Sequence, residues 1–261
     1  MKQVKTICIG TIICFLTSCS GDKLEEKGFS VNPTTESDGE TKTEGLSRDS
    51  LTFETKPSNV LLTGIPQYRL TTVYKVNYNK KKETTFIGSN NFHSNHSTLG
   101  RTNGNQWNYN YIPGLEAVYG YNMVNISHYD IVADKQKNFF EKPVLIKTLY
   151  YPSYSKDTLN YKPVNRNYFM TSVYDDDTNK DGFINIKDLR RFYFFDINGE
   201  NQKALVPKNY SVMKSEYDPA NDFMYVFAQL DENNNGKRDE REATHIFWID
   251  LKDPNKTGRQ L

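Results

Sequence analysis

Four short segments, rich in aromatic and β-branched residues, constrain the fold more than any other feature of this sequence. Each segment ends in a polar residue and a turn, and a second strand-like run follows. The polar markers are Asn77, Asp130, Asp196 and Asp250, which are separated by 53, 66 and 54 residues. In the third segment the turn is Asn198-Gly199, a strong hairpin signal between two apolar runs. With 18 Tyr and 15 Phe favouring strands over helices, the sequence predicts an all-β domain of antiparallel hairpin repeats.

The spacing of these hairpins leaves more than one β architecture open. Repeats of this length resemble the blades of a β-propeller, each of which is a small antiparallel sheet. Four units are few for a closed ring, and any β-meander produces similar hairpins. A propeller-like arrangement, a partial propeller and a sandwich are therefore all compatible with residues 51–261.

The first residues have the organisation of an export signal. Lys2 and Lys5 precede an apolar run over residues 6–18, which is too short to span a bilayer. The run ends in Leu16-Thr17-Ser18-Cys19, which resembles the lipobox of bacterial lipoproteins. The resemblance implies a signal peptide over residues 1–18 and a mature chain that begins at a Cys19 carrying acyl chains such as palmitate. An ordinary secretory signal with a chance cysteine is the alternative.

The residues after Cys19 give an expected location and a tether. Ser20 stands where an inner-membrane retention signal would have Asp, so the resemblance implies an outer-membrane lipoprotein. The acidic run at residues 22–26 is similar to surface-export tags, or is an ordinary solvated linker. Residues 19–50 are mostly polar, with Phe29 as their only aromatic, and we expect a disordered tether that reaches on the order of 30 Å.

Cysteine content and charge restrict both the stabilising chemistry and the partners. Cys8 and Cys14 would leave with the signal peptide, so the mature chain could form no internal disulfide. The net charge is +1, and removing Lys2 and Lys5 leaves about −1, without a basic field for nucleic acid. The expected partners are therefore the membrane, through the lipid anchor, and an envelope protein or a glycan.

Two twelve-residue stretches carry a pattern of oxygen-bearing side chains. Residues 177–188 and residues 231–242 both place such side chains at positions 1, 3, 5, 9 and 12, with glycine at position 6. They resemble the calcium-binding loops of EF-hand proteins, in which alternate residues of a tightly curled loop point inward. Runs of Asp, Asn and Gly also form ordinary turns, but the pattern occurs twice, 54 residues apart, each time before the same aromatic strand and Asp.

The resemblance implies a set of calcium ligands in each loop. Side chains are expected at most positions, the residue at position 7 offers its carbonyl, and position 9 acts directly or through water. In the first loop the ligands would be Asp177, Asn179, Asp181, Phe183, Asn185 and Asp188. In the second loop they would be Asp231, Asn233, Asn235, Lys237, Asp239 and Glu242. We expect moderate affinity, because each loop offers only about three carboxylates.

The surroundings of the loops differ from those of an EF-hand. EF-hands have a helix on each side and an apolar residue at position 8; Ile184 fits this position and Arg238 does not. Residues 223–228 and 244–249, which flank the second loop, have the composition of strands. The first loop also resembles a dockerin repeat, although dockerin repeats lie closer together and on helices. The loops of integrin-type propeller repeats, which link two strands, are the better analogy.

The sequence contains no recognisable catalytic motif. It lacks a nucleophile elbow, a phosphate loop and a dinucleotide fingerprint, whereas paired carboxylates for glycoside hydrolysis stay open. Residues 103–111 mix aromatics with amides and could bind a sugar, or form strand and turn. We expect a non-enzymatic, lipid-anchored envelope protein with a structural or binding role. The alternatives are a glycan-binding or glycan-hydrolysing surface lipoprotein and a component of an outer-membrane complex.

Overall fold

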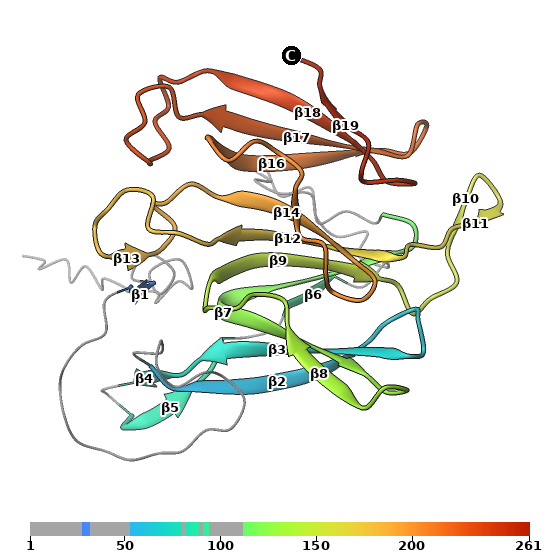
Figure 1. Ribbon diagram of the computed structural model, residues 1–261, viewed down its shortest axis with the longest axis horizontal. Coiled ribbons are helices and arrows are strands. Elements are labelled where there is room, and N and C mark those ends of the chain that lie inside the picture. Colours follow the sequence, from blue (N-terminus) through green and yellow to red (C-terminus); the bar gives the residue numbers. More distant parts are fainter. Residues whose placement is uncertain (1–27, 32–52, 80–81, 89–90, 94–111) are drawn as a thin grey trace, which may run out of the picture.

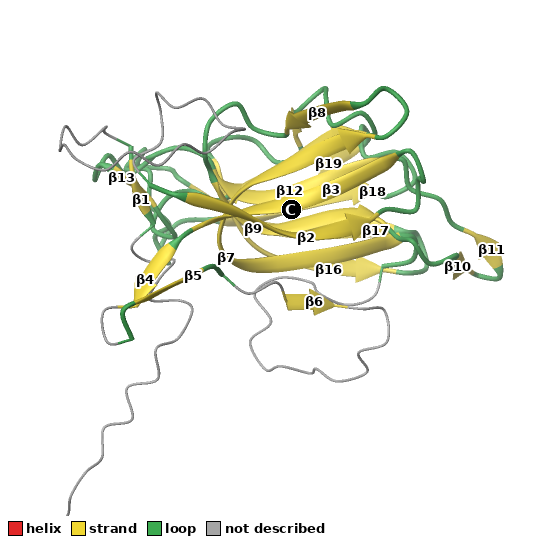
Figure 2. Ribbon diagram, turned by 90° about the horizontal axis from the view of Figure 1, so that it is seen from below, coloured by secondary structure: helices red, strands yellow, loops and turns green. Residues whose placement is uncertain are grey.

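The structure is a computed structural model that describes residues 28–31, 53–79, 82–88, 91–93 and 112–261. Across this part of the chain it contains strands and no helix (Figure 2). All of the strand pairings among these residues are antiparallel. The predicted all-β, antiparallel class is therefore confirmed. A search of the same residues for a helix that could cross a membrane finds none.

Most strands belong to two sheets, which we call the large sheet and the C-terminal sheet. The large sheet contains β2 (Thr55–Leu62), β3 (Tyr68–Lys75), β6 (Asn91–His93), β7 (Leu115–Asp130), β8 (Lys135–Asn138), β9 (Leu145–Pro152), β12 (Tyr168–Tyr174), β14 (Arg191–Asp196) and β15 (Lys203–Ala204). Its strand order is β15-β14-β12-β9-β7-β3-β2, and β6 and β8 also pair with β7. The C-terminal sheet contains, in spatial order, β16 (Tyr210–Asp218), β17 (Phe223–Leu230), β18 (Thr244–Asp250) and β19 (Thr257–Arg259).

Three small strand pairs complete the described fold. They are β1 (Phe29–Ser30) with β13 (Phe183–Ile184), β4 (Asn77–Asn79) with β5 (Thr84–Phe86), and β10 (Thr158–Leu159) with β11 (Lys162–Pro163). In both views the β1–β13 pair and the β10–β11 pair lie at opposite ends of the molecule (Figures 1 and 2).

The four predicted hairpins are present as β4–β5, β7–β8, β14–β15 and β18–β19. Three of the polar markers cap the turns that follow them. Asp130 accepts the backbone N–H groups of Val132 and Ala133, and Asp196 and Asp250 accept backbone N–H groups in the same way. A propeller is not confirmed, because the large sheet continues over nine strands instead of dividing into four-stranded blades.

Two central strands of the large sheet, β9 and β12, are buried on both faces, and most of their residues are apolar or aromatic. In β12, Met170 packs in the cluster under the C-terminal sheet, together with Val226 and Ile249. The next residue toward the N-terminus, Phe169, points to the opposite face and joins a second cluster. That second cluster also contains Leu61 and Leu70 of β2 and β3, so the large sheet curls over its own far strands.

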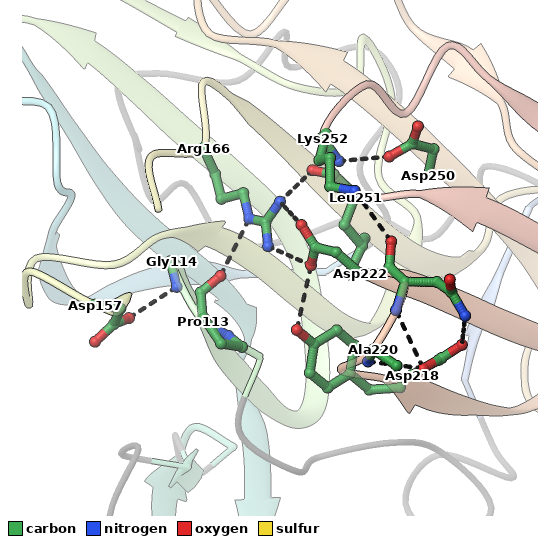
Figure 3. Close-up of polar contacts among 12 residues, drawn as sticks. Pro113, Gly114, Asp157, Arg166, Asp218, Ala220, Asp222, Asp250, Leu251 and Lys252 are labelled. Atoms are coloured by element: carbon green, nitrogen blue, oxygen red, sulfur yellow. Dashed lines mark hydrogen bonds and ion pairs between the residues drawn. The ribbon is translucent and has the colours of Figure 1, made fainter. Parts of the chain in front are cut away.

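A buried arginine fixes the C-terminal sheet against the large sheet (Figure 3). Arg166, just before β12, forms a two-pronged ion pair with Asp222, with N–O distances of 2.7 and 2.9 Å. The same guanidinium donates to the carbonyls of Pro113 and Leu251, and the hydroxyl of Tyr168 also donates to Leu251. Removing one partner of such a pair leaves an uncompensated buried charge, so this network holds the two sheets in one orientation.

For residues 28–31 the prediction of a flexible tether is wrong. Phe29 is 6% exposed and packs in a cluster with Val124, Leu145, Tyr174 and Ile184. The one aromatic side chain of the polar stretch therefore buries enough apolar surface to offset the entropy of ordering its short strand. The predicted signal peptide, and residues 19–27 and 32–50 of the predicted tether, which include Cys19, lie outside the described residues.

Candidate metal-binding loops

The two predicted calcium loops occupy equivalent places between antiparallel strands. Residues 177–188, called loop 1 below, connect β12 to β14 in the large sheet. Residues 231–242, called loop 2, connect β17 to β18 in the C-terminal sheet. Strands flank both loops, as the sequence indicated for loop 2, so neither loop has the helical surroundings of an EF-hand.

The first residue of each loop organises the turn through both carboxylate oxygens. Asp177 Oδ1 accepts the N–H of Asp181 at 3.0 Å, and its Oδ2 accepts the N–H of Gly182 at 2.8 Å. Asp231 makes the same two bonds, four and five residues along the chain, to Asn235 and Gly236 at 3.0 Å each. The position-1 carboxylate is therefore held at the centre of each loop.

The intermediate oxygen-bearing residues repeat one arrangement. The side chain at positions 3, 5 and 9 accepts the backbone N–H two residues further along, at 2.8–3.0 Å, as in an Asx turn. In loop 1 these acceptors are Asn179, Asp181 and Asn185, and in loop 2 they are Asn233, Asn235 and Asp239. The three side chains of loop 1 thus make the same hydrogen bonds as the three equivalent side chains of loop 2.

The position-12 carboxylate closes each loop onto its own beginning. Asp188 Oδ1 accepts the N–H of Asn179 at 3.2 Å, and its Oδ2 accepts the N–H of Asn185 at 2.9 Å. Glu242 Oε1 accepts the N–H of Asn233 at 3.4 Å and that of Glu232 at 3.1 Å. In both loops the last residue therefore bonds the backbone of position 3, which brings the two ends of the ligand pattern together.

The backbone of the two loops is equivalent as well. Position 4 is left-handed in both, with φ of 58° at Lys180 and 56° at Asn234. The glycine at position 6 has φ of 85° in loop 1 and 70° in loop 2, a conformation that a β-carbon disfavours. Glycine was expected at position 6 for this reason, whereas the left-handed residue at position 4 was not predicted.

The closing carboxylate of loop 1 lies in an environment that disfavours its negative charge, and that of loop 2 has an oxygen without a partner. Asp188 is 1% exposed, and its burial, together with the charge of Asp177, raises its pKa to about 6 despite the hydrogen bonds it accepts. In loop 2, Glu242 Oε2 is buried and has no hydrogen-bond partner among the described residues. A bound cation would compensate the charge of Asp188, because an adjacent positive charge favours an ionised carboxylate, and it would give Glu242 Oε2 a partner.

The other predicted ligands are backbone carbonyl oxygens and side-chain amide oxygens. Phe183 and Lys237, whose backbone carbonyls were expected at position 7, both have exposed side chains. Within the described chain, no three His, Cys, Asp or Glu side chains are grouped closely enough to hold a metal. The loops combine carboxylates with amide and carbonyl oxygens, and hydrogen bonds to the backbone hold the carboxylates in place.

The two loops touch each other, which the sequence did not indicate. Thr178 Oγ1 donates to the carbonyl of Gly236 at 2.6 Å and accepts the N–H of Leu189 at 2.8 Å. A β-carbon on Gly236 would lie 1.8 Å from the Thr178 carbonyl oxygen. Position 2 carries no ligand in the predicted pattern, so no sequence signal singled out Thr178.

Comparison with known proteins gives no independent assignment. Neither the protein-family models nor the curated proteins contain a match to this sequence. Residues 103–111, the predicted sugar-binding alternative, lie outside the described residues. The internal equivalence of the two loops therefore carries the functional argument.

Proposed function

We propose that this protein is a lipid-anchored component of the bacterial cell envelope whose β-domain binds calcium through loop 1 and loop 2. The observation that carries the proposal is the shared hydrogen-bond network of the loops, which orients equivalent oxygens from positions 1, 3, 5, 9 and 12. Calcium prefers six to eight hard oxygen ligands, and such a loop presents side-chain and carbonyl oxygens of that kind. The role is structural or binding, without catalysis.

Calcium would act as a staple in a chain that has no disulfide available after processing. Each loop joins two adjacent strands, and the loops touch at Thr178 and Gly236, so bound ions would stabilise both sheets near their point of contact. A ligand that binds only the folded state stabilises it by mass action. We expect dissociation constants of about 0.1–1 mM, as in extracellular modules, so the external medium would saturate the sites.

Calorimetry with calcium tests this proposal directly. We expect the wild-type protein to bind two ions and to lose thermal stability in chelator. Asp177→Ala and Asp231→Ala should each abolish one binding event, because position 1 contributes a carboxylate to each loop. Asp196→Ala is the matched control, since Asp196 accepts backbone N–H groups in a turn outside both loops. Absence of calcium binding to the wild-type protein would refute the proposal.

Lipid anchoring has a separate test. The sequence Leu16-Thr17-Ser18-Cys19 supports acylation of Cys19, and such acyl chains anchor a protein to a membrane. The wild-type protein should incorporate labelled palmitate and fractionate with the outer membrane. Cys19→Ser should abolish incorporation and release the protein from the membrane. Labelling that persists in Cys19→Ser would exclude Cys19 as the anchor.

A further inference from the structure

The short strand β1 docks on loop 1 at the positions that curl around the expected ion. Phe29 pairs with Ile184 and Ser30 pairs with Phe183, while the N–H of Val31 donates to the carbonyl of Gly182 at 3.0 Å. These contacts involve positions 6, 7 and 8 of the loop. An EF-hand would use position 8 to pair with a second loop, whereas here an N-terminal segment takes that place.

The fit of β1 against loop 1 depends on a glycine. Gly28 has φ of 52°, and a β-carbon there would lie 1.8 Å from the carbonyl oxygen of Ile184. The Gly28 carbonyl accepts a hydrogen bond from Lys75 Nζ at 2.8 Å. Backbone atoms of β1 and of loop 1 are therefore in direct contact, so a change in the shape of the loop must be transmitted to the strand.

Docking of β1 also orients a predicted ligand. The carbonyl of Gly182 points toward β1, since it accepts the N–H of Val31. The N–H of Phe183 points the other way and donates to Asp181 Oδ1 at 3.0 Å. In an extended residue the N–H and C=O lie on the same side of the strand, so the Phe183 carbonyl faces the side of Asp181. That carbonyl is the position-7 oxygen expected to bind calcium.

We propose that β1 is a clasp whose docking is coupled to calcium in loop 1, and that the clasp sets how far the domain stands from the membrane. The proposal rests on the calcium sites and the lipid anchor proposed above. Calcium favours the loop shape that β1 recognises, and β1 favours the carbonyl orientation that calcium requires. Because coupling between two binding equilibria is reciprocal, each must strengthen the other by the same factor.

The position of β1 in the sequence gives the coupling a consequence. With β1 docked, Gly28 lies nine positions after Cys19, and an extended chain of that length spans at most about 30 Å. With β1 released, the next described residue is Phe53, 34 positions after Cys19 (53 − 19), and a chain of that length spans at most about 110 Å. Calcium would thus hold the domain close to the lipid surface, and its removal would raise the maximum length of the attachment more than threefold.

The test measures the calcium affinity of each loop separately in the full mature chain. Asp231→Ala isolates loop 1, and Asp177→Ala isolates loop 2. We expect Gly28→Val to weaken calcium binding to loop 1 by about fivefold or more and to leave loop 2 unchanged. Val31→Ala is the matched control, because the Val31 side chain is exposed and the substitution keeps the backbone N–H. This variant should bind calcium as tightly as the same protein with Val31 in place. Phe29→Ala provides a second way to undock β1.

Hydrogen exchange gives the reciprocal readout. Chelator should accelerate exchange of the Val31 N–H by the same factor by which Gly28→Val weakens calcium binding. If loop 1 binds calcium and neither Gly28→Val nor Phe29→Ala changes its affinity, the clasp is refuted and the calcium sites stand. If the wild-type protein binds no calcium, the proposed function and the clasp both fail.

Discussion

Loop 1 and loop 2 share one internal network but lie in very different surroundings. Loop 1 is covered by β1 at positions 6–8, and its Ile184, Asn185 and Asp188 are buried. Loop 2 buries Asp231 and Gly236 and leaves most of its other residues exposed. The same geometry in two environments indicates that the ligand pattern itself determines the shape of the loop. The environment then determines how much each position matters for stability.

The largest expected difference concerns the position-6 glycines. Gly236→Ala combines a left-handed backbone with a clash against the Thr178 carbonyl, and should lower the free energy of unfolding by about 4 kcal/mol. Gly182→Ala meets no atom within 4 Å, so only the backbone term of about 1–2 kcal/mol applies. Denaturant unfolding of the two variants measures the difference. Equal losses would show that the loops are not packed together.

The burial of the closing carboxylate in loop 1 predicts a dependence on pH. Because the folded state raises the pKa of Asp188 to about 6, it binds the proton more tightly than the unfolded chain does. Stability from this group is present below its ordinary pKa and is lost as pH rises through 6, by about 3 kcal/mol in total. Unfolding in chelator across this range measures the loss.

Two controls accompany the pH measurement. Saturating calcium should remove the loss, because the ion favours the ionised carboxylate. Asp188→Asn should also remove it, because the amide does not titrate in this range. A calcium-free wild-type protein whose stability does not change between pH 4 and pH 7 would contradict the burial argument.

Local patterns in the sequence predicted the parts of the structure that depend on local interactions. The hairpins after Asp130, Asp196 and Asp250 follow from alternating apolar residues and turn-forming side chains. The strand flanks of loop 2 follow from β-branched and aromatic residues. In each case the residues that determine the structure are close neighbours in the sequence.

The contacts that join distant segments could not be predicted in this way. The ion pair of Arg166 with Asp222 and the contact of Thr178 with Gly236 each connect residues more than 50 positions apart. Whether strands divide into propeller blades also depends on pairing between distant segments. Here nine strands join one continuous sheet instead. Phe29 differs from these cases, because a single aromatic residue in a polar stretch is a local signal of burial. The polar composition of that stretch nevertheless predicts that Phe29 belongs to the tether.

The contact between the loops can be tested at position 2. Thr178→Val keeps the size of the side chain but leaves the N–H of Leu189 and the carbonyl of Gly236 without their partner. Unsatisfied buried groups of this kind cost about 2 kcal/mol in unfolding free energy. Glu232→Val at the same position of loop 2 changes an exposed side chain and should cost less than about 0.5 kcal/mol. Similar values for the two variants would mean that the Thr178 contact contributes nothing.

The smallest expected difference lies at position 8. Ile184 is 3% exposed and packs against Phe29 and its neighbours, so Ile184→Val removes one buried methylene and should cost about 1 kcal/mol. Arg238 is exposed at the same position of loop 2, and Arg238→Ala should change stability by less than about 0.5 kcal/mol. Hydrogen exchange at Val31 distinguishes the causes. If the cost of Ile184→Val arises at the contact with β1, exchange at Val31 should accelerate, and unchanged exchange would place the cost elsewhere in the cluster.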